Sequence, residues 1–172
     1  MTALTLAHTA VSILPIGFGF YAFARHGRIN LKTQSGKWYL GTMLAGSVSS
    51  LGFITTLGFT PGQVLTLATL AALLIGTVTL RGNWRTPGYT QAIALTTSFL
   101  LLMVFATTET LKRFPSGQPF ASGPNDPSLI PIRLSLLVAY VIGLGYQLVK
   151  IRAKQNPVAR LERILARYHH TA

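Results

Sequence analysis

The sequence has no cysteine and few acidic residues. The absence of cysteine excludes disulfides, thiolate metal sites and cysteine nucleophiles, and the 3 Asp and Glu residues leave few carboxylates for acid–base catalysis. Charged residues make up only 10% of the chain, against about 25% in a typical soluble domain. Because so little charge cannot coat a water-facing surface, we expect a lipid bilayer around this chain. A dedicated enzyme would be poorly equipped with these residues.

Apolar residues are abundant and gather in five long stretches. They make up 49% of the sequence. A helix needs roughly 20 residues to cross the hydrocarbon, and lipid cannot satisfy an open backbone. The sequence predicts an all-α bundle of five transmembrane helices within residues 1–150, followed by a basic tail over 151–172. The predicted spans are 4–24, 38–59, 64–80, 89–111 and 132–149.

The basic residues predict how these spans are oriented. Twelve of the 15 Lys and Arg residues lie in 25–37, 81–85 and 150–167, which fall on one side if the spans alternate in direction. An excess of Lys and Arg is typical of cytoplasmic loops, so we predict an outer N-terminus and a cytoplasmic C-terminus. The first apolar stretch has no basic residues before it, which favours a retained span over a cleaved signal peptide. Nucleic-acid binding is not expected, because the basic residues are divided among several loops.

The tail after Pro157 has a helical pattern of its own. Its apolar residues recur at helical spacing, and Arg160, Arg163 and Arg167 take the other positions. This pattern is typical of an amphipathic helix on the anionic cytoplasmic leaflet. A solvated basic tail and a helix that docks on a partner subunit are the alternatives. We also expect contacts with lipid or a partner at two tryptophans near span ends, Trp38 and Trp84.

His8 is the main candidate for a cofactor site. On a helix it shares a face with Ser12, Pro15, Gly19 and Ala22, mostly small residues that let membrane helices approach closely. A polar group at that depth suggests an axial ligand to a haem or chlorin, a partner for a quinone carbonyl, or a proton relay. The competing interpretation is an interfacial histidine bonded to headgroups or a backbone carbonyl. No second histidine lies at the same membrane face, so one chain cannot hold a haem between two histidines.

Glu109 is the only acid near a predicted span. Arg113 lies one turn further along, and Arg133 begins the last span, so the structural interpretation is an ion pair that closes the outer rim. The functional alternative is a carboxylate that shares a proton-handling or quinone site with His8.

Small residues predict where the first two spans pack on their neighbours. In the second span they recur on one face, a pattern typical of closely packed membrane helices. The predicted packing positions are Ser12, Gly19, Gly41, Ala45, Ser49 and Gly52.

The first 60 residues combine a histidine in the first span, a Gly-rich stretch and a loop from Arg28-Ile29-Asn30 to Ser35-Gly36-Lys37-Trp38-Tyr39. This arrangement resembles a family of uncharacterised bacterial membrane proteins. That family places a second histidine just before the Gly-basic-x-Tyr element that begins its second span, whereas residues 32–37 here read Lys-Thr-Gln-Ser-Gly-Lys. The resemblance implies a bacterial cytoplasmic (inner) membrane, and the missing histidine weakens the case for a haem.

Together these features favour a non-catalytic accessory or structural subunit of a larger membrane complex, such as a respiratory or photosynthetic one. The chain has little ionisable chemistry, several small-residue faces and a basic tail suited to docking. A membrane redox protein that binds a pigment, haem or quinone through His8 is the alternative, and a small transporter is the third hypothesis. The expected partners are membrane lipids and other membrane subunits.

Overall fold

The computed structural model describes residues 3–54, 58–81 and 87–155, and all regular structure in these ranges is helical. This confirms the predicted all-α fold. Residues 156–172, with Arg160, Arg163 and Arg167, lie outside the described residues, as does Trp84. The five α-helices are α1 (Ala3–His26), α2 (Gln34–Leu51), α4 (Pro61–Arg81), α5 (Pro87–Leu111) and α6 (Ile130–Gln155), and the short 3-10 helix η1 (Pro127–Leu129) precedes α6.

Each helix overlaps one predicted span, but the boundaries differ. α2 begins at Gln34 and ends at Leu51, whereas the predicted span covered 38–59. α6 continues to Gln155, beyond the predicted end at 149. Three segments are long and apolar enough to cross a membrane, namely Pro61–Leu80, Gly88–Leu111 and Pro127–Gln155. The structure therefore supports membrane integration for α4, α5 and α6 by length and composition.

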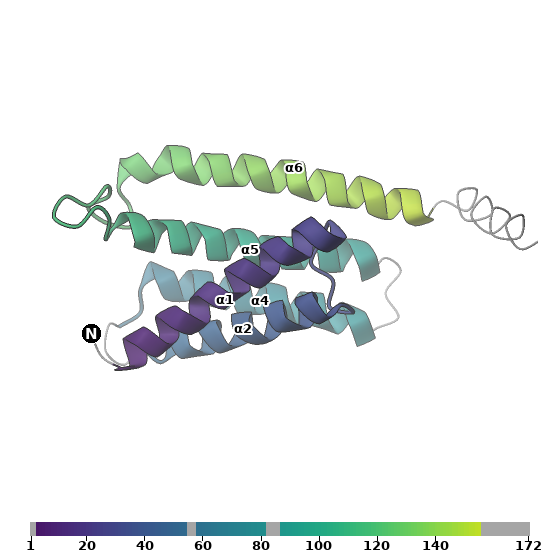
Figure 1. The fold of residues 1–172 in the computed structure, drawn as a ribbon, viewed down its shortest axis with the longest axis horizontal. Helices are drawn as coiled ribbons and strands as arrows, with labels where there is room; N and C mark the ends of the chain where they lie inside the picture. Colours follow the sequence, from purple (N-terminus) through teal and green to yellow (C-terminus); the bar gives the residue numbers. More distant parts are fainter. Residues whose placement is uncertain (1–2, 55–57, 82–86, 156–172) are drawn as a thin grey trace, which may run out of the picture.

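The helices run back and forth along the long axis of the molecule, so that their ends gather at two poles (Figure 1). One pole, here named the basic end, contains the end of α1, the beginning of α2 and the end of α6, with Arg25, Lys37 and Lys150. The opposite pole, here named the loop end, carries residues 112–129 between α5 and α6. The alternation of direction is the one that the sequence predicts.

The turn between α1 and α2 is specified by local chemistry. Gly27 follows α1 with a φ of 70°, a left-handed conformation that suits glycine at the end of a helix. Thr33 then caps α2, because its side chain accepts a hydrogen bond from the Gly36 amide at 3.2 Å. Gly36 packs directly on the carbonyl of Asn30, where a Cβ atom would overlap the backbone. These contacts place the start of α2 earlier than hydropathy alone indicates.

The core lies among α1, α2, α4 and α5. Its largest fully buried side chain is Tyr39 of α2, which packs with Leu95 and Phe99 of α5 and with Leu73 of α4. Gly19 of α1 fits directly against the Phe99 ring, because an added Cβ atom there would overlap the ring. Large apolar side chains from four helices thus fill the middle of the bundle.

The predicted packing face of α2 is used only in part within the chain, because Ser49 contacts His8 of α1 whereas the other predicted positions are exposed. Gly41 has no atom within 4 Å of an added Cβ, and Ala45 is exposed, as is Gly52. α2 is instead rotated so that it buries the larger Tyr39 and Met43 side chains, because removing their apolar area from solvent is favourable. The close approach to α1 occurs at Gly46, where an added Cβ atom would lie 3.3 Å from Ser12 Oγ.

α6 lies at the side of the bundle and packs mainly on α5 (Figure 1). Two pairs of side chains join these helices along their middle, in addition to the contact of Arg133 with Thr108 near the loop end. Thr96 Oγ1 donates to Gln147 Oε1 at 3.1 Å, and the hydroxyls of Thr97 and Tyr140 lie 2.9 Å apart. Only 6% of the α6 span is buried, against 39% for α5 and 33% for α4. The remaining surface of α6 is available for lipid or another protein.

Candidate functional site

His8 points into the bundle and is held by two serine hydroxyls. Its Nδ1 lies 2.8 Å from Ser49 Oγ, and its Nε2 lies 3.5 Å from Ser12 Oγ. Ser49 donates its own hydroxyl hydrogen to the Gly46 carbonyl at 2.9 Å. His8 therefore donates from Nδ1 to Ser49, and Nε2 is left to accept from Ser12. The ring also packs edge to face on Phe53, with centroids 5.3 Å apart.

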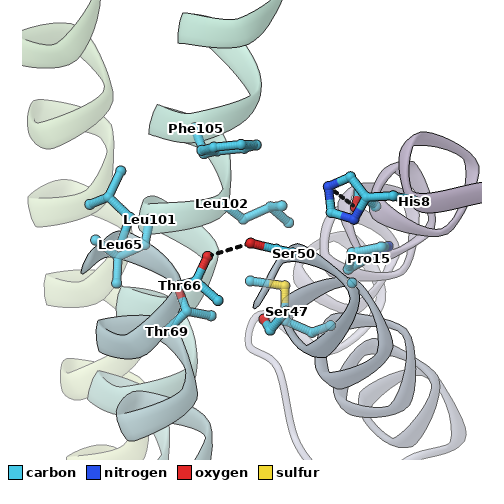
Figure 2. Close-up of a pocket in the computed structure, with 13 residues that line it drawn as sticks. His8, Pro15, Ser47, Ser50, Leu65, Thr66, Thr69, Leu101, Leu102 and Phe105 are labelled. Carbon is cyan, nitrogen blue, oxygen red and sulfur yellow. Dashed lines mark hydrogen bonds between the residues drawn. The ribbon is translucent and has the colours of Figure 1, made fainter. Parts of the chain in front are cut away.

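A small cavity, here named the His8 cavity, adjoins this histidine. Its volume is about 60 Å³, and it lies between α1, α2, α4 and α5 (Figure 2). Hydroxyls dominate its polar lining, and those of Ser50 and Thr66 lie 2.9 Å apart and join α2 to α4. The other hydroxyls that line it belong to Ser12, Ser47 and Thr69.

This geometry does not fit a haem, chlorin or quinone at His8. Sites for molecules of that kind occupy roughly 300–1,000 Å³, far more than the 60 Å³ found here. Both ring nitrogens are also engaged by protein hydroxyls, so that neither is directed at an open position. Of the two sequence interpretations, the structure favours a hydrogen-bonded structural histidine. Its partners are serine hydroxyls, where the sequence suggested headgroups or a backbone carbonyl.

A second and larger cavity, here named the loop-end cavity, has a volume of about 620 Å³. It lies between the beginning of α4 and the end of α5, and Pro124, Asn125 and Arg133 close its outer side. Leu65 and Phe105 line both cavities and therefore stand between them. Apolar side chains form its walls, and its polar groups come from Thr60, Thr108, Glu109, Asn125 and Arg133.

Glu109 makes a rim ion pair with the predicted Arg113 and also with Lys112, but not with Arg133. Its carboxylate lies 2.8 Å from Lys112 Nζ and 3.2 Å from Arg113 Nη2. Arg133 instead donates from Nη2 to Thr108 Oγ1 at 3.4 Å and to the Pro124 carbonyl. The structure does not bring Glu109 and His8 together, because they line different cavities. Lys112 was overlooked in the sequence, although its i, i+3 spacing from Glu109 was a usable signal.

The loop that covers the larger cavity is fixed by Asp126. This carboxylate accepts from the Ser122 amide and hydroxyl, each at 2.7 Å, and from the Ser128 amide at 2.9 Å. These donors stabilise the ionised form and hold the pKa of Asp126 well below its usual range. Pro124 and Asn125 lie inside the turn that Asp126 closes, so this turn positions the outer wall of the cavity.

Trp38 lies at the basic end, where the sequence places an interfacial aromatic. It is exposed and stacks on Phe18 of α1, with ring centroids 6.0 Å apart.

The described residues contain no group of three His, Cys, Asp or Glu side chains that could hold a metal ion. No family model, no curated protein and no solved structure matches this chain. The resemblance seen in the first 60 residues therefore stays a prediction.

Proposed function

We propose that all five long helices cross a bacterial inner membrane, with the loop end outside and the basic end in the cytoplasm. α1 and α2 lie alongside three helices that are long and apolar enough to span. Both acids in the described residues, Glu109 and Asp126, lie at the loop end. The basic end carries an excess of Lys and Arg over acids, which favours a cytoplasmic position.

The absence of cysteine makes this topology directly testable. A single cysteine at Ser116, in the outer loop, should react with a membrane-impermeant maleimide added to intact cells. A single cysteine at Lys32, between α1 and α2, should react only after the membrane is permeabilised. The opposite labelling pattern would reverse the orientation, and equal labelling of both sites in intact cells would contradict an odd number of spans between them.

We further propose that the chain is a non-catalytic accessory subunit of a larger membrane complex, of the energy-converting class, and that α6 is its docking helix. The observation that carries this proposal is the low burial of α6, because only 6% of the residues in its apolar span are fully buried within the chain. Ile142 and Val149 are each 69% exposed. A helix that contributes so little to its own bundle has most of its surface free for a second protein.

Gly145 on α6 supports docking of a helix, because it lies on the same helix face as the exposed Ile142 and Val149. Gly143 and Gly145 have no atom within 4 Å of an added Cβ, so each leaves the backbone accessible from outside the chain. Small residues allow close helix–helix contact in membranes, where packing takes the place of the hydrophobic effect.

The other two hypotheses receive less support from the geometry. The redox hypothesis needs a ligand at His8 that the 60 Å³ cavity does not admit. A transporter needs a polar path across the bundle. The two cavities lie in the half nearer the loop end, and Tyr39, Leu95 and Phe99 fill the core beyond them.

Site-specific photo-crosslinking in native membranes tests the subunit proposal. A photoreactive residue at Ile142 on α6 is compared with one at Leu74 on α4, which is 64% exposed and so has a matched exposure. We expect Ile142 to give a discrete adduct with a different protein and Leu74 to give lipid adducts. Lipid adducts alone at both positions, or an adduct with a second copy of this chain, would overturn the proposal.

A further inference from the structure

Arg133 carries a charge that nothing in the described part of the chain neutralises. Its hydrogen bonds come from Nη2 and reach only neutral acceptors, the Thr108 hydroxyl and the Pro124 carbonyl. Its Nε is buried and has no hydrogen-bond partner among the described residues. Burying part of a cation without an anion is costly, so a guanidinium in this state favours the arrival of a negatively charged group.

The nearby carboxylates are already engaged elsewhere. Glu109 is paired with both Lys112 and Arg113. Asp126 accepts hydrogen bonds from Ser122 and Ser128 within its own turn. Among the described residues, the charged side chains that line the loop-end cavity are Glu109 and Arg133. Because Glu109 is already paired, the uncompensated positive charge falls on Arg133.

The walls of the same cavity are apolar. Phe59 contributes from the segment before α4 and Val64 from the beginning of α4, and Val104 and Phe105 contribute from the end of α5. The volume of about 620 Å³ lies within the usual range of small-molecule sites. One cationic group at the rim of an apolar chamber suits a ligand with an anionic head and a hydrocarbon chain.

We propose that the loop-end cavity binds a single-chain lipid anion. Its carboxylate or phosphate head pairs with the Arg133 guanidinium, which can bind either group through two parallel hydrogen bonds. Its hydrocarbon chain lies against Phe59, Leu65 and Phe105. This proposal is independent of the docking role of α6, since it rests on Arg133 and the walls formed by α4 and α5.

Binding is measured with the full chain in phosphatidylcholine nanodiscs. The probes are radiolabelled palmitate, lysophosphatidate and hexadecanol, which share a long chain and differ in head group. We expect saturable binding of an anionic probe and none of hexadecanol. Tighter binding of palmitate would identify a fatty carboxylate as the ligand, and tighter binding of lysophosphatidate a phospholipid-derived phosphate. Equal binding of hexadecanol, or no saturable binding of either anion, would overturn the proposal.

Two variants test the site itself. Arg133→Gln should weaken binding about tenfold or more, the usual effect of losing a charge-assisted hydrogen bond. Arg113→Gln is the matched control, because Arg113 is 55% exposed and contacts only Glu109, which keeps Lys112. Val64→Trp should block binding by filling the chamber without changing any charge. Wild-type affinity in both Arg133→Gln and Val64→Trp, with all variants eluting as folded monodisperse particles, would contradict the assignment.

Discussion

The hydrogen bond between Tyr39 and Ser98 gives a sharp test of how the core is held together. Tyr39 is fully buried, and its hydroxyl lies 2.8 Å from Ser98 Oγ. Ser98 donates its own hydrogen to the Leu95 carbonyl, also at 2.8 Å. The Tyr39 hydroxyl is therefore the donor in this pair. We expect Ser98→Ala to destabilise the protein more than Tyr39→Phe, although each removes one hydroxyl from the same bond.

The difference follows from what each change leaves behind. Tyr39→Phe removes the donor, and Ser98 keeps its bond to Leu95, so the loss is that of one net hydrogen bond, about 0.5–1.5 kcal/mol. Ser98→Ala leaves the Tyr39 hydroxyl buried without an acceptor, which costs about 1–3 kcal/mol. The double variant leaves no unpaired group, so its stability should lie close to that of Tyr39→Phe alone.

The free energies of unfolding of all four proteins can be compared by titration with SDS in mixed micelles, with far-UV circular dichroism as the signal. Tyr39→Val serves as a control for lost packing volume. If Ser98→Ala is no more destabilising than Tyr39→Phe, the Tyr39 hydroxyl is not the donor to Ser98. The same conclusion follows if the double variant loses the sum of the two single losses.

Two further predictions concern the α1–α2 turn and the outer loop. Gly36→Ala should destabilise the protein by about 1–3 kcal/mol in the same titration, because its Cβ would overlap the Asn30 carbonyl. Gly41→Ala is the control, because open space surrounds Gly41, and it should be neutral or stabilise by up to about 1 kcal/mol. Equal effects of the two substitutions on stability would contradict this packing. The pKa of Asp126 is lowered on folding, so its contribution to the loop is complete above the ordinary carboxyl pKa of about 4 and is lost as the pH falls below that value. The protection factors of the amides in residues 116–126, which are corrected for the intrinsic exchange rate at each pH, should therefore fall on acidification in the wild type. In Asp126→Asn they should already be low at pH 7, and wild-type protection factors that do not change with pH would refute the role of this carboxylate.

The helices could be predicted from the sequence because length and hydropathy determine them in lipid. Their ends could not, because end positions depend on caps and turns. Thr33 starts α2 at Gln34 by accepting from the Gly36 amide, and a hydropathy window does not register such a bond. α6 continues to Gln155 because a helix does not have to end where its apolar stretch does. The tail beyond it carries the predicted amphipathic pattern and lies outside the described residues.

The site was partly predictable for the same physical reason. The helical spacing of His8 and Ser12 already placed both on one face, and the structure finds them in contact at 3.5 Å. The stronger partner, Ser49, is 41 residues away in the chain, and only the pairing of α1 with α2 brings it there. Glu109 and its partners are local on α5, whereas the isolation of Arg133 depends on how the loop folds over the cavity. Contacts within a helix can be read from spacing, and contacts between helices require the packed structure.

The position of Arg133 connects the two proposals in a way that can itself be tested. Arg133 belongs to α6, yet it lines a cavity built by α4 and α5, so an anion bound there would tie the beginning of α6 to the rest of the bundle. A ligand that stabilises one position of α6 changes the affinity of any partner that docks on this helix, and by linkage the partner changes the affinity for the ligand equally. Crosslinking at Ile142 should then differ between the wild type and Arg133→Gln, although the two positions are separated by more than two turns of α6. Identical crosslinking in both proteins would show that the cavity and the docking face act independently.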